Sequence, residues 1–413
     1  MQKKYDIVVA GGGTSGCACA YTASLLGLKT LLIEKSIHLG GAITSGLVIP
    51  AMKSSDNQIN TDFFEKLSNT LKNLGGQVTY MGNIGWFNPE LTKIALDRLM
   101  LSANVDIIFA KKIHSVEFEK NKIIGIFLDE MLSEYIETTY LVDATGDCEI
   151  AKLCDCDFLE EKFQSSSLRF QMSGVDLEKF SKWLLDFDKD RNVTTCEVIN
   201  GDIHLSTACT DNGNWALRPI FDLAIKNGDL EPHDCTYFQI FTVAGMKGTI
   251  NFNAPRIELN PLNIDSKALI EGRESILRLS KFCCKYFQGF ENAYISNISD
   301  IAGIRVSRRI RGKYVYTKDD LISGKTFKNP VLNGNYPIDI HSNKNGKLEK
   351  ITRDYQLPVE SLISSNYDNL FVVGRAISAD FEAQSALRIQ PSCFSMGEGL
   401  AKFLAKEQKK TVD

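Results

Sequence analysis

The sequence predicts an α/β fold in which a parallel sheet begins at the N-terminus, is completed by the last part of the chain and is interrupted by a β-rich insert. An apolar strand-like run, Tyr5–Ala10, leads directly into a glycine cluster and a helical stretch. Successive strand-like runs follow between residues 105 and 142, and a strand and helix pattern returns at 369–405. Between them, residues 165–175 and 248–259 alternate polar and apolar side chains, as half-exposed strands do.

The size and charge of the chain favour a protein that binds a small molecule. Its 413 residues are enough for two or three domains with a sizeable core. The formal charge of −4 is nearly balanced, and the basic cluster at residues 305–311 is short, so we expect no binding to nucleic acid. No run is apolar for long enough to form a transmembrane segment, and the N-terminus enters a strand without a cleavage site. We therefore expect a cytoplasmic protein.

The cysteines do not indicate a disulfide framework. There are 11 of them, an odd number, in a long chain without a signal peptide, which favours reduced thiols. None of the close pairs forms C-x-x-C, and no second pair lies at the spacing of a zinc finger. We expect no metal site.

The glycine cluster has the order G-x-G-x-x-G. Gly11 allows a tight turn out of the strand, Gly13 lets the backbone approach a pyrophosphate, and Gly16 lets the helix pack closely on the sheet. We expect this helix over Cys17–Leu26, with its N-terminus pointing at the phosphates. The next strand, 29–33, ends at Glu34, where an acid accepts hydrogen bonds from ribose hydroxyls. This register predicts a Rossmann-like dinucleotide-binding unit, without distinguishing NAD from FAD.

Two later segments resemble those of glutathione-reductase-type flavoproteins. In KSIHLGGAITSG, residues 35–46, Gly40 and Gly41 match the pair that passes close to the ribityl and pyrophosphate groups. LVDATGDCEIA, residues 141–151, looks like the Ala-Thr-Gly segment at which the chain meets the dinucleotide again. Both segments favour FAD.

A third segment lies near the end of the chain. Residues 369–405 contain a strand ending at Gly374, then a loop, then a helix from about Pro391 or Ser392. In the resembling flavoproteins the N-terminus of such a helix lies at the pyrimidine end of the flavin, where its partial positive charge stabilises the reduced anion.

With these segments the chain resembles the bacterial FAD-dependent oxidoreductase family, which is related to the glutathione reductase and fumarate reductase flavoproteins. The matching pieces also include IRVSRRIRGKYVYT, YPIDIH and LPVESLI, so the likeness covers nearly the whole chain. It implies FAD and redox chemistry, while most members of the family have no assigned substrate.

Two departures from better-known relatives refine the expectation. No His occupies residues 40–46, where succinate dehydrogenases attach FAD covalently, so we expect non-covalent FAD. There is no C-x-x-x-x-C after the first unit and no second G-x-G-x-x-G. A disulfide reductase that takes electrons from NADPH on a second Rossmann domain is therefore disfavoured.

The motifs and the resemblance together assign the residues that bind FAD. The expected contacts are Gly11, Gly13, Thr14, Ser15, Gly16, Glu34, Lys35, Gly40, Gly41, Thr44, Ser45, Gly46, Ala144, Thr145, Gly146, Asp147, Gly374, Arg375, Pro391 and Ser392. We expect a discontinuous FAD-binding domain of the glutathione-reductase type, built by residues 1–155 and 350–413, with an inserted substrate or cap domain at 156–349. Its half-exposed strands would cover the isoalloxazine ring.

The insert supplies most of the candidates for catalysis. In YPIDIH, Asp339 and His341 share a strand face, so they form either a catalytic pair or a structural histidine at a strand end. Whether the segment is extended or helical, at least two of Arg305, Arg308 and Arg309 converge. They would bind a carboxylate substrate or the flavin phosphates; the alternative is a solvated basic face.

The C-terminal segment adds further candidates. Arg375, Glu382 and Arg388 are expected in the loop beside the flavin. Cys393, close to the start of the last helix, has either a pKa depressed by the helix N-terminus or the inert thiol of a buried cysteine. The residues we assign to catalysis are His341, Glu382 and Arg308.

The predicted function is hydride transfer between a small polar or anionic metabolite and N5 of FAD. Two alternatives stay open at this point: a flavoprotein subunit that passes electrons to a protein or quinone acceptor, and a module that binds FAD without turnover. An oligomer is compatible with either. The insert carries no motif that identifies the substrate.

Overall fold

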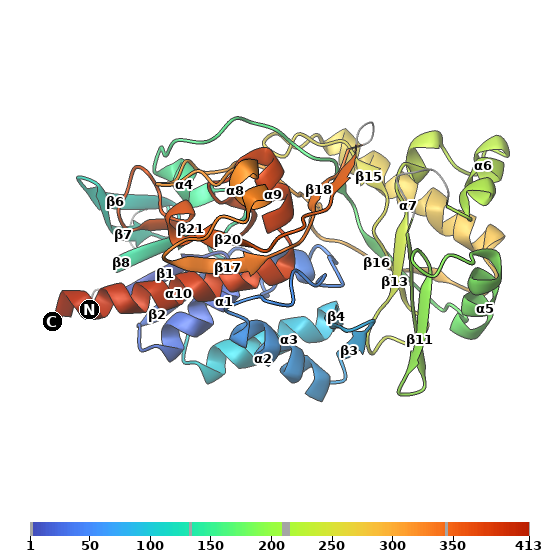
Figure 1. Ribbon diagram of the computed structural model, residues 1–413, viewed down its shortest axis with the longest axis horizontal. Helices are drawn as coiled ribbons and strands as arrows, with labels where there is room; N and C mark the ends of the chain where they lie inside the picture. The colour runs from blue at the N-terminus through green and yellow to red at the C-terminus, as the bar shows by residue number, and fades with distance from the viewer. Residues whose placement is uncertain (1–2, 132–133, 209–214, 343–345, 413) are drawn as a thin grey trace.

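The computed structural model describes residues 3–131, 134–208, 215–342 and 346–412. Two regions lie side by side along the longest axis (Figure 1). The larger region is built around a mostly parallel sheet and contains both termini, and the smaller is built around an antiparallel sheet. The α/β fold with a Rossmann-like parallel sheet is confirmed.

The larger sheet has seven strands in the order β5-β2-β1-β8-β7-β6, with β21 also paired to β8. β5, β2, β1, β8 and β21 are parallel, while β7 is antiparallel to β8 and β6 is antiparallel to β7. Their bounds are β1 (Lys3–Ala10), β2 (Thr30–Glu34), β5 (Asp106–Phe109), β6 (Ser115–Glu119), β7 (Lys122–Phe127), β8 (Tyr135–Asp143) and β21 (Leu370–Val372).

Strand β8 has a shared edge. Residues 135–137 of β8 pair with β7, whereas residues 141–143 pair with β21. The other edge of β8 pairs with β1 along its whole length. The last part of the chain is therefore hydrogen-bonded into the centre of the sheet that the first part begins.

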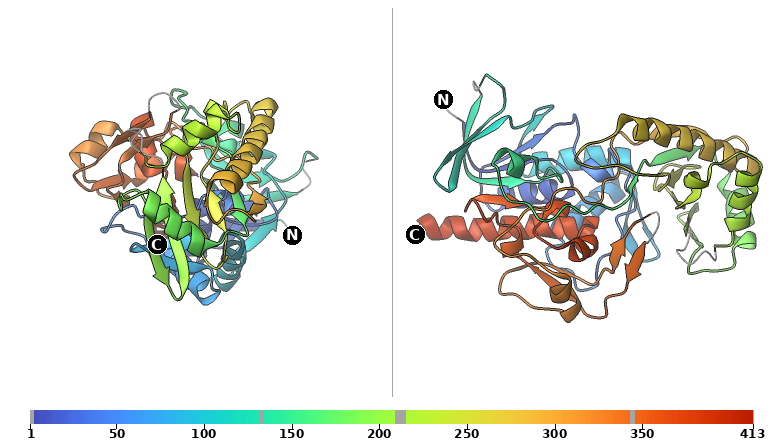
Figure 2. Two further views of the ribbon diagram at one scale, coloured as in Figure 1. Left: turned by 90° about the vertical axis from the view of Figure 1, so that its right-hand side faces the viewer. Right: turned by 90° about the horizontal axis from the view of Figure 1, so that it is seen from above.

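Helices α1 and α10 pack against each other under this sheet (Figures 1 and 2). Because α1 carries small residues from Gly16 to Ala20, it is buried on every side and comes close to its neighbours. A Cβ at Gly397 of α10 would collide with the carbonyl oxygen of Ser15. The helices of the larger region are α1 (Thr14–Leu25), α2 (Asp62–Asn73), α3 (Pro89–Ser102), α4 (Glu149–Leu153), α8 (Lys318–Ser323), α9 (Phe381–Leu387) and α10 (Gln390–Val412).

The smaller region is a six-stranded antiparallel sheet in the order β11-β12-β13-β14-β10-β16. Its core is rich in aromatic side chains, with Phe170 stacked on Phe252 at 4.2 Å between ring centroids. The strands are β10 (Phe170–Ser173), β11 (Thr195–Ile199), β12 (Asp202–Ala208), β13 (Gln239–Thr242), β14 (Ile250–Phe252) and β16 (Tyr294–Ile298), and the helices are α5 (Leu177–Phe187), α6 (Arg218–Lys226) and α7 (Ser266–Tyr286).

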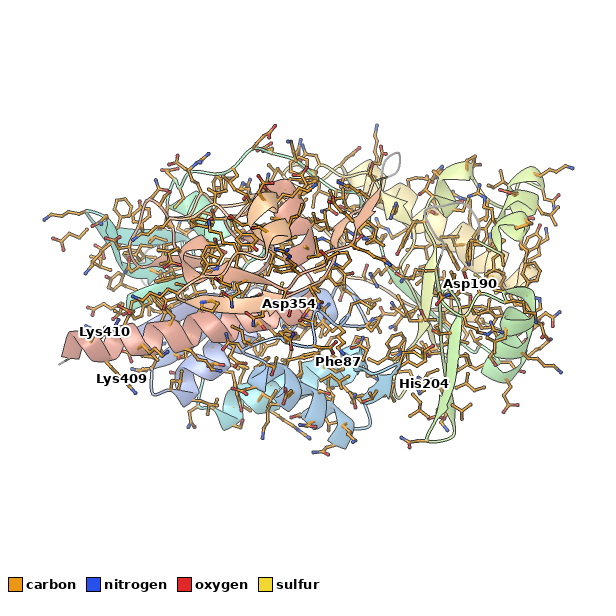
Figure 3. The ribbon with its side chains drawn as sticks, in the orientation of Figure 1. Phe87, Asp190, His204, Asp354, Lys409 and Lys410 are labelled. Atoms are coloured by element: carbon orange, nitrogen blue, oxygen red, sulfur yellow. The ribbon has the colours of Figure 1, made fainter. Side chains whose placement is uncertain are left out.

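A hairpin of β3 (Gln77–Tyr80) and β4 (Asn83–Phe87) joins the two regions. The indole Nε1 of Trp86 donates to the carbonyl of Thr242 at 2.9 Å, and the hydroxyl of Tyr80 donates to Thr195 at 2.6 Å. Phe87, at the end of the hairpin, is buried in the larger region, and His204 is buried in the smaller one (Figure 3).

Short elements complete the fold. They are β9 (Ser166–Ser167) with β15 (Arg256–Ile257), β17 (Pro330–Gly334) with β20 (Tyr355–Pro358), β18 (Ile338–Ile340) with β19 (Lys347–Glu349), and the 3₁₀ turns η1 (Gly41–Ile43), η2 (Pro232–Cys235), η3 (Val359–Ser361) and η4 (Gly374–Ala376). Of the helices in the described residues, none combines the length and the apolar character needed to cross a membrane.

Most expected elements are present, with two differences. Helix α1 starts at Thr14, three residues before the expected start at Cys17. The loop expected after Gly374 contains helix α9, which Asp380 caps by accepting a hydrogen bond from the backbone of Ala383 at 2.8 Å.

The packing does not follow the expected domain division throughout. Tyr316, Leu321, Leu332 and Ile338, which the sequence assigns to the insert, are buried in the core that contains β1 and α1. The aromatic core of the smaller region extends only from Leu168 to Phe290. The boundaries at 155 and 350 remain a prediction.

The contact between α1 and α10 yields a stability prediction. Gly397→Ala places a Cβ against the backbone carbonyl of Ser15, which cannot move away as a side chain can, so we expect a loss of about 1–3 kcal/mol in the free energy of unfolding. Denaturant unfolding measures it. The control is Gly272→Ala in α7, where the nearest atom is a side-chain methyl of Ile257 at 2.9 Å. If Gly397→Ala is as stable as the parent, the described packing is wrong.

Candidate functional site

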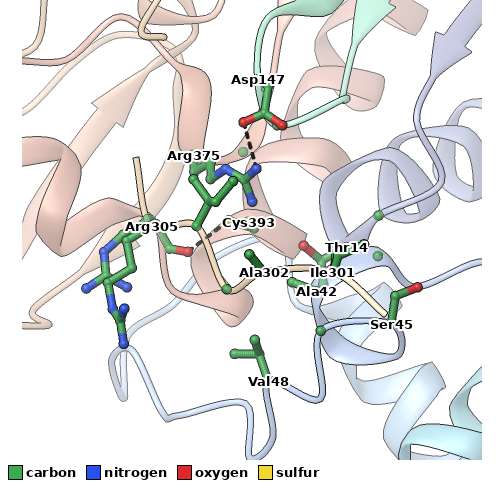
Figure 4. Close-up of a pocket in the computed structure, with 18 of the residues that line it drawn as sticks. Thr14, Ala42, Ser45, Val48, Asp147, Ile301, Ala302, Arg305, Arg375 and Cys393 are labelled. Atoms are coloured by element: carbon green, nitrogen blue, oxygen red, sulfur yellow. Dashed lines mark hydrogen bonds and ion pairs between the residues drawn. The ribbon is translucent and has the colours of Figure 1, made fainter. Parts of the chain in front are cut away.

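A cavity of about 1510 Å³ lies between the two regions. Its floor is formed where β1, β2, β8 and β21 end, the edge at which parallel sheets bind ligands. Residues of the smaller region, including Tyr237 and Arg256, line the same cavity. Figure 4 shows part of it, with Thr14 and Ser45 on one side and Arg305 on the other.

The glycine loop forms one end of the cavity. Gly11 has a φ of 101°, and a Cβ at Gly16 would collide with the carbonyl of Gly11, so both positions require glycine. A Cβ at Gly13, in contrast, would meet no protein atom within 4 Å, because it would project into the cavity. Helix α1 begins at the next residue with no acidic side chain in its first turn. This surface fits a pyrophosphate.

The second glycine pair lies directly against the first loop. The backbone N–H of Gly40 donates to the carbonyl of Gly12 at 2.8 Å, and a Cβ at Gly41 would approach the Cα of Gly13 to 3.2 Å. Thr44 is buried, and its hydroxyl donates to the carbonyl of Leu39 at 2.9 Å. Two segments far apart in sequence thereby form one continuous glycine surface.

Glu34 lies at the end of β2 and lines the cavity. One carboxylate oxygen accepts from the backbone of Gly12 at 2.6 Å, and the other accepts from the backbone and hydroxyl of Ser36 at 2.8 and 2.7 Å. These bonds hold the carboxylate in one orientation at the cavity, and Oε2, which accepts only from Gly12, retains a lone pair for a ribose hydroxyl. The geometry fits the predicted ribose-binding acid.

The chain after β8 contributes an ion pair. Arg375 donates to Asp147 at 2.8 Å (Figure 4). The hydroxyl of Ser307 donates to the same carboxylate oxygen at 2.6 Å. Burial opposes ionisation of Asp147, but Arg375, Ser307 and Lys35 outweigh it, so its pKa lies below the usual value. Arg308 donates to the backbone carbonyl of Asp147 at 3.3 Å.

Most of the residues predicted to bind the cofactor lie around the cavity. Those that line it are Gly11, Gly13, Thr14, Ser15, Glu34, Lys35, Gly41, Ser45, Gly46, Ala144, Thr145, Gly146, Asp147, Gly374 and Arg375. Those outside the lining are Gly16, Gly40, Thr44, Pro391 and Ser392. The first three hold the glycine segments together, the carbonyl of Pro391 accepts from Gln58 at 2.7 Å, and Ser392 is fully buried.

Only two of the three residues assigned to catalysis line the cavity. His341 and Arg308 line the cavity, but Glu382 does not. Glu382 lies in the first turn of α9, on a side where its charge acts on Lys318 and Arg309. Its expected place in a loop beside the flavin is therefore wrong, because that segment is helical.

The arginine cluster does not form one face. Residues 305–309 lie outside the regular helices and strands, so the side chains diverge. Arg305 and Arg308 both line the cavity, whereas Arg309 is buried and donates to the carbonyls of Ala379 at 2.7 Å and Glu160 at 2.5 Å. The alternative of a solvated basic face is wrong for Arg305 and Arg309, which are 9% and 3% exposed.

Four buried or nearly buried arginines lie together in one part of the cavity, which we call the arginine chamber. They are Arg169, Arg256, Arg305 and Arg388, and Tyr237, Tyr336, Asp339 and His341 lie among them. The guanidinium carbon of Arg256 lies 4.1 Å from the centre of the Tyr237 ring, a cation–π contact. Burial, followed by the charges of the other arginines, lowers the pKa of Arg305 to about 9.

The expected pairing of Asp339 with His341 is present, at 3.0 Å between Oδ2 and Nε2. On the other side of the ring, Nδ1 lies 2.7 Å from Nη2 of Arg256. Because arginine has no acceptor, Nδ1 accepts and Nε2 carries the proton. Burial first, and then the charge of Arg305, lowers the pKa of His341 to about 3 despite Asp339. The ring is neutral and both its nitrogens are engaged.

Cys393 lies in the first turn of α10 and lines the cavity. Its thiol donates to the carbonyl of Arg388 at 3.3 Å. Burial raises the pKa of this thiol to about 11, because the effect of burial is larger than the opposite effect of the nearby arginines and hydroxyls. Of the two alternatives for Cys393, a depressed pKa or an inert buried thiol, the structure supports the inert buried thiol.

Two chamber residues, Arg169 and Arg256, were missed from the sequence. Each stands in a segment predicted to be a half-exposed strand, where an arginine is ordinarily a solvent-facing residue. The sequence offered one local indication that these segments are buried: Arg169 lies between Leu168 and Phe170, and Arg256 precedes Ile257. That signal does not reveal that both side chains face the cavity.

Comparisons with known proteins give short or distant matches. A digeranylgeranylglycerophospholipid reductase from Methanococcus vannielii is 36% identical over 63 residues, 15% of this chain and 16% of that protein. A thiamine thiazole synthase from Saccharolobus islandicus is 27% identical over 157 residues, 35% of this chain and 56% of that protein. The chain thus spans little more than half of the length of the thiamine thiazole synthase and less than a fifth of the length of the reductase.

Solved structures resemble the fold. The p-nitrophenol 4-monooxygenase PnpA from Pseudomonas putida superposes with a TM-score of 0.52 at 10% identity, covering 100% of this chain and 82% of that one. The flavin-dependent brominase Bmp2 gives a TM-score of 0.50 at 11% identity, covering 98% of this chain and 79% of that one. At such identities the likeness supports the fold alone.

The cofactor follows from a match over nearly the whole chain. The model of the family described as FAD dependent oxidoreductase matches residues 6–413. The open space at Gly13, the N-terminus of α1 and the carboxylate of Glu34 fit the pyrophosphate and ribose of that cofactor. The chain therefore belongs to the FAD-dependent oxidoreductase family.

Proposed function

We propose that this enzyme transfers a hydride between a small polar or anionic metabolite and N5 of FAD. One observation carries the proposal: the cavity that contains the glycine surface continues into the arginine chamber. A ligand in the chamber would lie beside the reactive end of a dinucleotide whose pyrophosphate rests on Gly13. Bound FAD supplies a two-electron acceptor or donor at that point.

The residues of the glycine end have binding roles in this proposal. The backbone at Gly13 and Gly41 lets the pyrophosphate approach, and the N-terminus of α1 stabilises its charge. Glu34 binds the adenosine ribose. Arg375 is held by its ion pair with Asp147, so its guanidinium keeps one orientation.

His341 has a positioning role rather than that of a proton acceptor. Its Nε2 proton is donated to Asp339 and its Nδ1 lone pair receives Arg256, so in this arrangement no lone pair remains for a substrate proton. The chain Asp339–His341–Arg256 instead fixes the guanidinium of Arg256 over Tyr237. This orientation presents a fixed cation to an anionic substrate.

The smaller region has the role of a cover. Tyr237 and Arg256 come from this region and line the same cavity as the glycine loop. We therefore propose a substrate-binding cap on a FAD-binding domain of the glutathione-reductase type, with a small molecule as its substrate.

The test is anaerobic reduction of the bound flavin. Small anionic metabolites are mixed with the holoenzyme and the visible flavin absorbance is followed by stopped flow. We expect bleaching by a substrate, and reoxidation by its oxidised product after chemical reduction. A flavin that no metabolite reduces or reoxidises, but that exchanges electrons with a protein or quinone, would contradict the proposal in favour of an electron-transfer subunit.

Gly13→Val provides a prediction for the cofactor site. The backbone of Gly13 has φ −75° and ψ −170°, which valine adopts without strain, and the new methyl groups would occupy only the cavity. We expect affinity for FAD to fall by about tenfold or more, which corresponds to ~1.4 kcal/mol. Acid release of FAD from the purified protein, with the unfolding midpoint of the apoprotein as the control, measures it. Unchanged FAD occupancy in Gly13→Val would show that the pyrophosphate lies elsewhere.

His341 provides a prediction for the pH dependence. With a pKa lowered to about 3, the folded His341 stays neutral with its proton on Nε2, while the unfolded residue gains a proton below about pH 6.5. The unfolded state therefore binds more protons between these values, and the contribution of His341 makes the fold less stable as the pH falls. Nitrogen-15 NMR of histidine-labelled protein, with His341→Gln to assign the signal, measures the tautomer. An imidazolium signal from His341 at about pH 5–6 would overturn the assignment.

A further inference from the structure

The arginine chamber contains more positive charge than its own carboxylate neutralises. Arg169 is 8% exposed and its Nη1 lies 3.4 and 3.3 Å from the carbonyl oxygens of Leu47 and Ile49. Arg305 is 9% exposed and donates to the carbonyl of Ser165 and the hydroxyl of Ser167. All of these acceptors are neutral.

Of Arg169, Arg305 and Arg388, only Arg388 forms an ion pair with a carboxylate within the described residues. Its Nη2 lies 3.5 Å from Oδ2 of Asp339. No other ion pair in residues 3–131, 134–208, 215–342 and 346–412 involves Arg169, Arg305 or Arg388. Within the same ranges, Nε of Arg388 is buried and has no hydrogen-bond partner. The protein therefore leaves this guanidinium only partly satisfied, and its side chain lines the cavity.

The surplus of positive charge is present at neutral pH, because the arginines and Asp339 are ionised there. Burial and mutual repulsion lower the pKa of Arg169 to about 10 and that of Arg305 to about 9, so both guanidiniums remain charged at neutral pH. Asp339 is ionised, since His341 and the arginines lower its pKa to about 2 against the effect of burial. Buried charges without a counter-charge are costly, so a ligand of opposite charge is favoured.

The size of the surplus indicates the charge of the ligand. The four guanidiniums of the chamber against its one carboxylate leave three positive charges, of which a monoanion would neutralise only one. The planar fork of arginine binds carboxylate or phosphate through two parallel hydrogen bonds. The three side chains reach the chamber from separate segments: Arg169 lies between β9 and β10, Arg305 follows β16, and Arg388 caps α9. Three segments of the chain thus bring their guanidiniums to the same part of the cavity.

We propose that the substrate of this enzyme is a small dianion, whose negative groups are bound by Arg169, Arg305 and Arg388. This inference rests on the proposed function, which places the substrate in the arginine chamber. A dicarboxylate and a phosphomonoester share the required charge, and they are separate arms of the test.

Binding is measured by calorimetry on the holoenzyme at constant ionic strength, without turnover. The probes are malonate and glutarate as dicarboxylates, phenyl phosphate as a phosphomonoester, propionate as a monoanion, and malonamide as an uncharged analogue. We expect at least one dianion to bind about tenfold or more tightly than propionate, with no measurable binding of malonamide. The class of dianion that binds more tightly, dicarboxylate or phosphomonoester, is the class to which the substrate is assigned.

Variants test the residues. Arg169→Gln and Arg305→Gln should each weaken the dianion about tenfold or more and reduce its preference over propionate, while FAD occupancy stays that of the parent. The matched control is Arg98→Gln, which removes the same charge from an exposed position of α3 outside the cavity. Arg305→Lys, which keeps the charge and loses the fork, should lie between the parent and Arg305→Gln.

The outcomes separate this inference from the proposed function. Equal binding of dianions and propionate, no binding of any dianion, or an equal loss in Arg98→Gln overturns the dianion assignment. Selective dianion binding by a protein whose flavin no metabolite reduces supports the assignment and contradicts hydride transfer. Flavin reduction by an uncharged or monoanionic metabolite, without dianion binding, supports hydride transfer and contradicts the assignment.

Discussion

The close approach of α1 to the loop that precedes it is the constraint on which the rest of the structure depends. Gly16 lies against the carbonyl of Gly11, and its missing Cβ also leaves room for Ala144, which a Cβ would approach to 3.0 Å. On the other side of the helix, Gly397 lets α10 reach the backbone of Ser15. Because no side chain separates these backbones, the N-terminus of α1 is held in one place relative to β1 and β8. The phosphate-binding geometry follows from that position.

The part of the site that was predictable from the sequence is the part made by local structure. The strand, the glycine loop, the helix and the acid at Glu34 follow one another without interruption, and each has a physical reason for its residue type. The main error at this end concerned a boundary: α1 begins at Thr14 because Gly13 can serve as its N-cap without a side-chain hydrogen bond. The pairing of Asp339 with His341 was predictable for the same reason, since two residues on one strand face are neighbours.

The chamber could not be predicted because its contacts join distant segments. The bond between Arg256 and His341 spans 85 residues, and it changes the chemistry expected of the histidine by occupying its lone pair. Arg169 reaches carbonyls about 120 residues earlier in the chain, at Leu47 and Ile49. Helix α9 was missed since AQSAL reads as either a helix or a loop, and its cap at Asp380 became evident only from the structure. Composition and spacing contain no information on which of these segments meet.

The shared edge of β8 also has a consequence for the order in which the protein is made. Ribosomes deliver the N-terminal residues first, so β1, β2 and β8 emerge long before β21 and α10. A nascent chain that ends before residue 370 leaves the carboxyl half of one edge of β8 without its partner and α1 without the helix that covers it. It also lacks Gly374 and Arg375 from the cavity wall. The cofactor site is therefore complete only after the C-terminal helix has been synthesised, and until then α1 and one edge of β8 lack the partners that cover them.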